Sequence, residues 1–214
     1  MNARYDIVII GGGHAGCEAA WAAARLGARA LLMTLSRNTI AAMSCNPSVG
    51  GPGKGHLVME IDALGGLMGL ASDATGIQFR RLNTKKGAAV RARRAQSDRA
   101  RYAEWMQDKL GHTQGLQIVE DEAVDIRVID GQRGKPAVSE VVGASGKAYP
   151  AAAVVLSAGT FLRGLMHIGM ESTRGGRHGD PAAYAMSECL ERLGFSLGRL
   201  KTGTCPRLHA DSID

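Results

Sequence analysis

Three glycines near the start of the chain, Gly11, Gly13 and Gly16, have a spacing that suits phosphate binding. They stand between an apolar, β-branched run at 5–10, which predicts a buried parallel strand, and a run of helix-forming residues at 17–26. In such a unit the first glycine permits a tight turn, the second lets the backbone approach a pyrophosphate, and the third lets the helix pack on the strand. We therefore predict that a dinucleotide binds the backbone amides of this glycine loop, at the positive end of the helix.

The sequence after this helix lacks one feature of NAD-binding proteins. Those proteins carry an acidic residue about 20 positions beyond the glycines, where it binds a ribose hydroxyl. The second predicted strand, at 28–34, ends without one, and residues 31–36 contain no acid. Thr34 remains as the side chain for a weaker hydrogen bond. The pattern therefore departs from that of ordinary NAD-binding proteins.

A second turn of small residues points to a flavin. An apolar run at 151–156 predicts a buried strand, and it ends in Ser-Ala-Gly-Thr at 157–160. In flavoproteins with two dinucleotide sites, a strand with such an ending returns beside the first nucleotide-binding strand. Taken alone, the turn is equally typical of an ordinary strand end. Combined with the glycine loop, it favours FAD.

Cys45 is the residue best suited to nucleophilic chemistry. It lies in a long glycine-rich loop ahead of Lys54 and His56, and cations near a thiol favour the reactive thiolate. Spacing alone favours a buried, inert cysteine, the interpretation also given to Cys17 and Cys189. The four cysteines form no CxxC pair and the six histidines have no metal-ligand spacing, so no metal is expected.

Positive charge is concentrated in one segment. The net charge of the chain is +6, yet residues 80–101 contain nine basic residues and one acid, Asp98. Such a segment can bind phosphates of a cofactor or of a nucleic acid, or form a solvated basic face. Aromatic residues are few around it, so the pattern typical of single-strand binding is weak. The basic residues are Arg80, Arg81, Lys85, Lys86, Arg91, Arg93, Arg94, Arg99 and Arg101.

The elements that must position these residues predict an α/β fold. It is a Rossmann-like FAD-binding fold of the glutathione-reductase-like, two-dinucleotide-binding type, truncated, with a small β-rich insertion at about 115–142. We expect helices at 54–64, ended by Gly65 and Gly66, at 97–110 with Ser97 as N-cap, and from Asp180 and Pro181 to 193, with Gly194 behind it. We expect strands at 77–82 and, as a meander, at 116–119, 123–129 and 137–142.

Composition excludes several classes of protein. Hydrophobic residues make up 45% and charged residues 21% of the 214 residues, which excludes general disorder. Glycine, with 29 residues, is roughly twice as frequent as usual but has no collagen period. No apolar run is long enough to span a membrane and no signal peptide is apparent, so we expect a cytoplasmic protein with reduced thiols and no membrane contact.

The combination of motifs resembles the GidA/MnmG family, flavoproteins that modify the wobble uridine of tRNA. The resemblance runs from Tyr5 to Asp214, and its CNPS and RAxRAQxDR stretches are more specific than the glycine motif. The matching segments are GGGHAG (11–16), MSCNPSVGGPGKGHLVMEIDALGG (43–66), GIQFRRLNTKKGAAVRARRAQSDR (76–99), VVLSAGTFLRG (154–164), GGRHGDP (175–181) and GRLKTGTCPRLHADSID (198–214).

The resemblance implies an enzyme that adds a (carboxymethyl)aminomethyl group to C5 of uridine 34, in the anticodon of tRNA. FAD would be the cofactor, methylenetetrahydrofolate the one-carbon donor and NADH the reductant, with an MnmE-type GTPase as partner and a homodimer as the full-length form. Cys45 matches a family cysteine near the flavin, whereas Cys205 has no family counterpart. By resemblance the FAD-binding residues are Gly11, Gly12, Gly13, His14, Ala15 and Gly16 at the pyrophosphate, Val124 at the adenine side, and Arg174 in place of a family serine.

Family members are longer, so residues 1–214 correspond to the N-terminal part of the FAD-binding domain, without the C-terminal domain. We expect this part alone to be inactive. Three other functions remain open. A folate-dependent tRNA uridine methyltransferase flavoprotein should lack the CNPS loop, and a generic flavin oxidoreductase should not bind tRNA. A non-catalytic nucleic-acid-binding module should bind tRNA in a salt-dependent manner without any flavin.

Cys45→Ser is expected to abolish tRNA modification by the full-length enzyme. A thiolate can add to the electrophilic C6 of uracil and make C5 nucleophilic, or it can move a proton, and serine does neither well near neutral pH. Nucleoside analysis of tRNA from cells carrying only the variant would measure this. Full modification would contradict both roles of the thiol.

Overall fold

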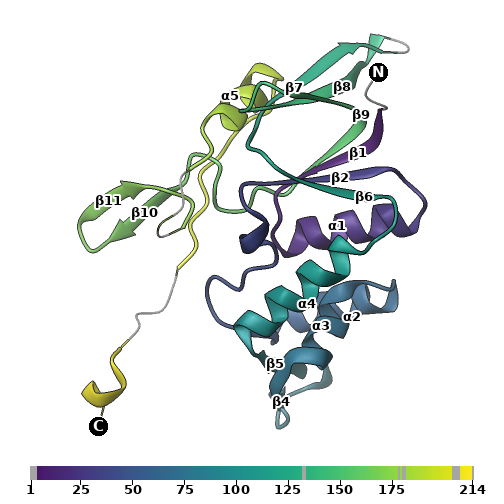
Figure 1. The fold of residues 1–214 in the computed structure, drawn as a ribbon. Helices are drawn as coiled ribbons and strands as arrows, with labels where there is room; N and C mark the ends of the chain where they lie inside the picture. Colours follow the sequence, from purple (N-terminus) through teal and green to yellow (C-terminus); the bar gives the residue numbers. More distant parts are fainter. Residues whose placement is uncertain (1–3, 132–133, 178, 180–181, 204–207, 214) are drawn as a thin grey trace.

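The computed structural model describes residues 4–131, 134–177, 179, 182–203 and 208–213. Its central sheet has the strand order β6-β2-β1-β9-β8-β7, and the first four of these run parallel (Figure 1). These four are β1 (Tyr5–Ile10), β2 (Ala30–Thr34), β6 (Leu116–Glu120) and β9 (Ala148–Leu156). The arrangement confirms the predicted Rossmann-like α/β fold.

The parallel strands are buried because apolar side chains cover both of their faces. Along β1, Ile9 belongs to the core on one side of the sheet, while Val8 and Ile10 belong to the core on the other. Three helices build the first core, which also contains Leu32 and the fully buried Tyr102 (Figure 1). They are α1 (His14–Arg25), α3 (Leu67–Thr75) and α4 (Arg99–Gly111).

The predicted meander is wrong at its first strand. β6 pairs in parallel with β2, in a register that joins Ala30 to Leu116, so it belongs to the main sheet. Only β7 (Ala123–Asp130) and β8 (Pro136–Gly143) form an antiparallel hairpin, which pairs onward with the first part of β9. A parallel partner across the α4 crossover is a long-range feature, and a five-residue apolar run has no local pattern that distinguishes it from a hairpin strand.

A second, three-stranded sheet lies at the end of the molecule away from the β7–β8 hairpin (Figure 1). Its order is β3-β5-β4, with β3 (Ser48–Gly50), β5 (Ala92–Ser97) and β4 (Gly76–Leu82) all antiparallel. The short helical turn η2 (Ala88–Val90) lies in the β4–β5 loop. Only β4 was predicted, because the basic sequence of β5 does not alternate as a half-buried strand should.

Two predicted helices differ from the structure at their boundaries. Asp98, not Ser97, caps α4: its carboxylate accepts from the amides of Ala100 and Arg101, both at 3.0 Å. Ser97 instead ends β5 and is buried. The predicted helix at 54–64 is α2 (Lys54–Ala63), and Gly65 follows it with the expected positive φ of 83°.

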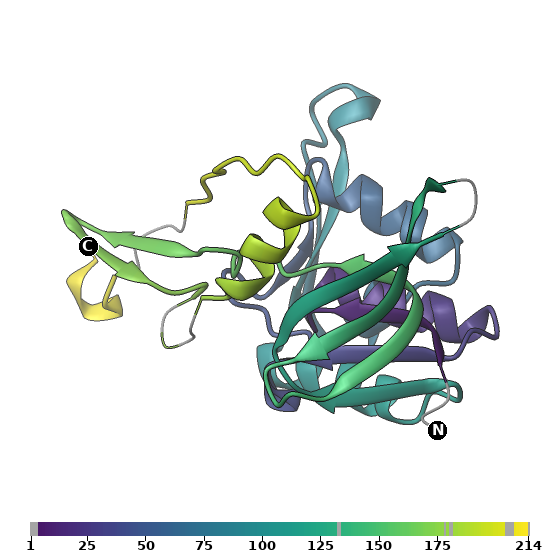
Figure 2. The same ribbon diagram turned by 90° about the horizontal axis from the view of Figure 1, so that it is seen from above.

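The C-terminal part forms a hairpin that extends away from the sheets (Figure 2). It consists of β10 (Leu165–Ile168) and β11 (Glu171–Arg174). The helix α5 (Ala185–Arg192) then packs on β7, and Gly194 follows it with a φ of 88°. The predicted helix start at 180–181 lies outside the described residues. Short turns η1 (Arg37–Thr39) and η4 (Ala210–Ser212) complete the elements.

Glu18→Ala is expected to lower the free energy of unfolding by about 2 kcal/mol, because two amides at a helix start lose their charged acceptor. The Glu18 carboxylate on α1 accepts from Leu67 N at 3.0 Å and Met68 N at 2.6 Å, and so caps α3, whose own N-cap is Gly66. Urea unfolding followed by circular dichroism measures the change. Glu60→Ala, on the exposed side of α2, is the control; equal losses for both variants would refute the capping role.

Candidate functional site

The glycine loop, residues 11–16, closes on itself so tightly that two of its glycines cannot be replaced. A β-carbon on Gly16 would lie 1.8 Å from the carbonyl oxygen of Gly11. A β-carbon on Gly11, whose φ is 109°, would lie 2.5 Å from the carbonyl oxygen of Ser157. The first and third glycines of the motif therefore serve the packing of α1 against the ends of β1 and β9, as predicted.

Gly13 has a different surrounding. A β-carbon on it would meet nothing within 4 Å, and its φ of −72° is open to any residue. It is the N-cap of α1, and no side chain in the described structure caps that helix end. The first amides of α1 are thus directed at open space beside a residue without a side chain. This geometry fits a pyrophosphate, which needs close backbone approach and N–H donors.

The 157–160 turn lies beside the glycine loop, as predicted. β9 pairs with β1 so that Leu156 is opposite Ile10. Ser157 then donates from its amide to Ile10 O at 2.8 Å, and its hydroxyl lies 2.9 Å from Ile10 O and 3.1 Å from Gly11 O. The turn therefore fixes the position of the loop.

The ribose and adenine of a dinucleotide extend from a glycine loop toward the carboxyl end of the second strand, here β2; Val124 follows β6, the neighbour of β2 in the sheet, and its contact with the cofactor stays a prediction. Asp121, three residues earlier, donates its amide to Thr34 O at 3.0 Å, which joins the end of β6 to the end of β2. Val124 itself is half-buried in β7. The Thr34 hydroxyl donates to Ser36 O at 3.1 Å, so it already has a partner within the chain.

The loop that carries Cys45 is attached at both ends. Near its start, Ala41 donates its amide to Gly12 O at 2.8 Å; near its end, Ser97 N donates to Pro47 O at 2.7 Å. Between them the Arg99 guanidinium donates to Cys45 O at 3.1 Å. The Cys45 side chain is exposed, so the buried position that spacing alone favours is wrong for this residue, while its catalytic role stays a prediction.

The other two described cysteines do fit the inert interpretation. Cys17 is fully buried under the glycine loop, and burial raises the pKa of its thiol to about 12. Cys189 is buried against β7, where its thiol lies 3.1 Å from a carboxylate oxygen of Asp125. Cys205 lies outside the described residues.

Two further cations hold the strand that follows Cys45. Lys54 Nζ donates to Ser48 O at 3.0 Å, and the Arg94 guanidinium reaches Ser48 Oγ at 3.4 Å. Desolvation and then repulsion from Arg94 lower the pKa of Lys54, while Cys45 acts in the opposite direction. The thiol of Cys45 therefore lies in a positively charged region, here formed by Lys54, Arg94 and Arg99, next to the glycine loop.

His14, the first residue of α1, is half-buried and packs against Tyr102 of α4. Its Nδ1 is buried without a hydrogen-bond partner, and its ring meets that of Tyr102 edge-on at 5.6 Å. Burial, followed by repulsion from Lys54, lowers the pKa of His14 to about 4, so the imidazole is neutral at physiological pH. Tyr102 OH and Ser97 Oγ are also buried without partners. Sequence reasoning missed this group, because α4 and the end of β5 lie far along the chain from His14 and no local pattern joins them.

Arg174 is not brought to the glycine loop by any described contact. It is exposed at the end of β11, where its guanidinium lies 5.3 Å from the ring centroid of Tyr184. The adjoining Gly176 is nearer to the site, because its carbonyl accepts from the Thr160 hydroxyl at 2.7 Å. The role of Arg174 in cofactor binding stays a prediction.

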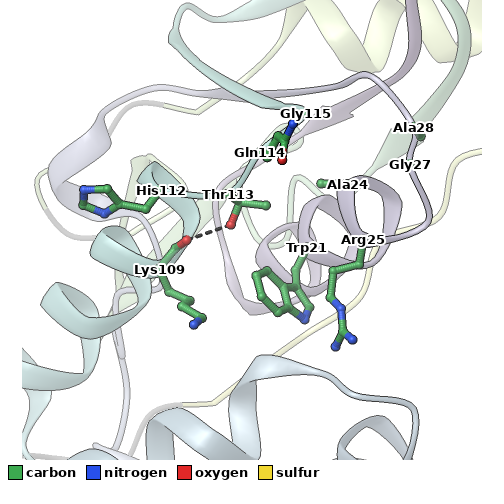
Figure 3. A pocket seen from close by; sticks show the side chains of 10 residues that line it. All are labelled: Trp21, Ala24, Arg25, Gly27, Ala28, Lys109, His112, Thr113, Gln114 and Gly115. Atoms are coloured by element: carbon green, nitrogen blue, oxygen red, sulfur yellow. Dashed lines mark hydrogen bonds between the residues drawn. The ribbon is translucent and has the colours of Figure 1, made fainter.

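A cavity of about 560 Å³ lies elsewhere, between the C-terminal ends of α1 and α4 (Figure 3). Arg25 and Lys109 both lie over the ring of Trp21 there, at 5.4 and 5.7 Å. Cations are favourable at helix C-termini, so their presence needs no ligand. Among the described residues no cluster suited to a metal and no helix long and apolar enough to cross a membrane is found.

Comparison with known proteins places this geometry in a family. The model of the family "Glucose inhibited division protein A" matches residues 6–214. Two crystal forms of GidA from Aquifex aeolicus superpose with TM-scores of 0.87 and 0.88 at 48% sequence identity. Each match covers 94% of this chain and 33% of that chain, so this chain spans about a third of the length of those proteins.

More distant structures share the fold alone. The GidA-related protein of Thermus thermophilus matches with a TM-score of 0.64 at 22% identity, covering 91% of this chain and 70% of that one. The p-nitrophenol 4-monooxygenase PnpA of Pseudomonas putida matches with a TM-score of 0.51 at 13% identity, covering 79% and 46%. The fold is thus shared with a monooxygenase, and a shared fold does not establish a shared chemistry.

His14 is expected to make the cofactor-free protein sensitive to acid. Its imidazole stays neutral in the folded state down to pH about 4 but takes a proton in the unfolded chain below about 6.5, so acid favours unfolding. Between pH 7 and pH 4 wild type should lose up to about 3 kcal/mol more unfolding free energy than His14→Gln. Denaturant unfolding across this range measures the difference. His112→Gln, at an exposed histidine, should keep the wild-type drop; if His14→Gln keeps it too, the assignment fails.

Proposed function

Because the chain belongs to the GidA family, we propose that it is the nucleotide-binding part of an FAD-dependent enzyme that modifies the wobble uridine of tRNA. In this proposal the complete enzyme adds a (carboxymethyl)aminomethyl group to C5 of uridine 34. The observation that carries the proposal is the family match over residues 6–214, which includes the loop around the exposed Cys45. The 48% identity to a GidA structure, over 94% of this chain, supports it.

The residues of the glycine loop fit FAD. The open space at Gly13 and the uncapped amides of α1 suit its pyrophosphate, and Val124 is the residue proposed to contact its adenine side. When bound, the flavin supplies the two-electron redox step of the reaction. The neutral His14 keeps positive charge off the first turn of α1, while its buried Nδ1 offers one unused hydrogen-bonding group to the site.

Cys45 would act on the uracil ring. Its thiolate adds to C6, forming a C–S bond, and the electrons of the C5–C6 double bond move toward C5 and O4. C5 then bonds to the methylene carbon of the folate while the bond from that carbon to one folate nitrogen breaks. Loss of the C5 proton and expulsion of the thiolate restore the ring, and a primary amine as co-substrate must then replace the second folate nitrogen, which releases tetrahydrofolate. In the alternative role Cys45 only moves a proton. In both roles the thiol must be reachable by the uracil, and Cys45 is exposed in the positively charged region that includes Lys54 and Arg99.

Several parts of the proposal concern the complete protein. Methylenetetrahydrofolate would supply the one-carbon unit, NADH would reduce the flavin, and an MnmE-type GTPase would act as partner of a GidA homodimer. Family membership supports these proposals but does not test them. The residues described here are the ones that would bind FAD and present Cys45, so the tests are directed at them.

The visible absorption spectrum of the protein purified from its complete reading frame tests the proposal. We expect a stoichiometric flavin spectrum in wild type and at least tenfold weaker FAD binding in Gly13→Ala, whose methyl group would occupy the space needed by the pyrophosphate. Gly111→Ala is the matched control, since its β-carbon also meets nothing within 4 Å but lies at the far end of α4.

The outcomes separate the possible functions. If the folded protein cannot be loaded with FAD, the proposal of a flavoprotein is refuted and a nucleic-acid-binding module is favoured. A flavoprotein whose loss leaves tRNA nucleosides unchanged would be an oxidoreductase with another substrate. Loss of the modified wobble nucleoside, without loss of 5-methyluridine, supports the proposed reaction over a methyltransferase.

A further inference from the structure

The hairpin of β4 and β5 with its loop, residues 76–97, here called the basic arm, places like charges directly opposite each other. Arg80 pairs in register with Arg94, and Arg81 with Arg93. Like charges at opposed positions of an antiparallel pair are destabilising. In the described part of the chain none of these four arginines forms an ion pair with a carboxylate. The arm therefore carries an uncompensated electrostatic cost that a bound polyanion would remove.

The arm also has an accessible edge and a groove. β4 is the outer strand of its sheet, and the arm points away from the central sheet (Figure 1). A groove of about 430 Å³ lies between it and α2 and is lined by Met59, Phe79 and the arginines, with Asp73 as its acidic residue. Phe79 is 59% exposed. Cationic side chains beside an exposed aromatic ring suit a nucleic-acid strand, whose phosphates and bases they bind respectively.

The positive charge is continuous with the candidate site. Arg94 reaches from the arm to Ser48 Oγ, and Lys54 binds the carbonyl of the same residue. Ser48 is three residues from Cys45, whose own carbonyl accepts from Arg99. A polyanion held on the arm would thus extend along these cations to the thiol. The pyrophosphate of a dinucleotide is not that anion, since its place is at Gly13.

We propose that the basic arm binds the ribose–phosphate backbone of the RNA substrate next to the reacting nucleotide, with Arg80, Arg81 and Arg93 on phosphates and Phe79 against a base. The inference rests on the proposed function and adds to it the surface that holds the RNA. Since the arm is formed by residues 76–97, this surface is separate from the FAD-binding residues of the glycine loop.

The test measures binding of an anticodon stem–loop RNA, with uridine at the wobble position, to the full-length flavoprotein at several salt concentrations. Arg80→Gln/Arg81→Gln should bind at least tenfold more weakly, and the slope of log K against log salt should fall by about 1.4 for two lost phosphate contacts. Phe79→Leu should weaken binding about fivefold or more with an unchanged slope, because stacking rather than charge is lost.

Arg25→Gln/Lys109→Gln is the matched control, since it removes two charges at the far cavity of Figure 3. It should leave both affinity and slope as in wild type. All variants must retain the flavin spectrum, which reports that the nucleotide-binding fold is intact. Equal affinity and slope in the arm variant and the control would overturn the arm as the RNA surface. Wild-type protein that holds flavin but does not bind the RNA would instead overturn the proposed function.

Discussion

The close approach of α1 to the strand ends positions everything else in the site. Gly16 lies against the carbonyl of Gly11, and Gly11 lies against Ser157, so the two ends of the glycine loop and the sequence-distant turn at Ser157 meet with no room for a β-carbon. This contact turns the first amides of α1 outward at Gly13. It also leaves Gly12 O facing the amide of Ala41, from which the Cys45 loop starts. A wider turn would shift the amides and the thiol together.

The Cys45 loop depends on both sheets. One end is tied to the glycine loop through Ala41 and the other to the second sheet through Pro47, while Arg99 binds the carbonyl of Cys45 itself. A 3.1 Å guanidinium–carbonyl bond directs positive charge at the backbone of the loop rather than at a carboxylate. The loop is therefore held in place without neutralising the cations around it. Those cations remain available to an anionic substrate, which is the arrangement that a nucleic-acid enzyme needs.

Features that depend on interactions between residues close in sequence could be predicted, whereas features that depend on contacts between distant segments could not. The glycine loop, the strand and helix on either side of it, and the end of α2 at Gly65 were predictable because each depends on neighbours within a few residues. The partner of β6 was not, since a parallel ladder to β2 requires the α4 crossover. The exposure of Cys45 was equally hidden, because it results from bonds that tie its loop to the distant Gly12 and to Arg99. The contact of His14 with Tyr102 joins two helices that no local pattern connects.

Two regions of the same fold carry the positive potential that suits an anion. At the glycine loop, positive potential comes from backbone amides and the end of α1, while the one titratable side chain there, His14, is kept neutral by burial and by Lys54. In residues 80–101 it comes from full charges, which give this segment a net charge of +8 within a chain of +6. Amides hold a small ligand at close range, because each must touch its oxygen. Opposed arginines on an exposed strand act over a longer distance and tolerate varied geometry, as binding to a long phosphate chain requires. The two regions are joined at Ser48, three residues from Cys45, because Lys54 donates to Ser48 O and the Arg94 guanidinium reaches Ser48 Oγ.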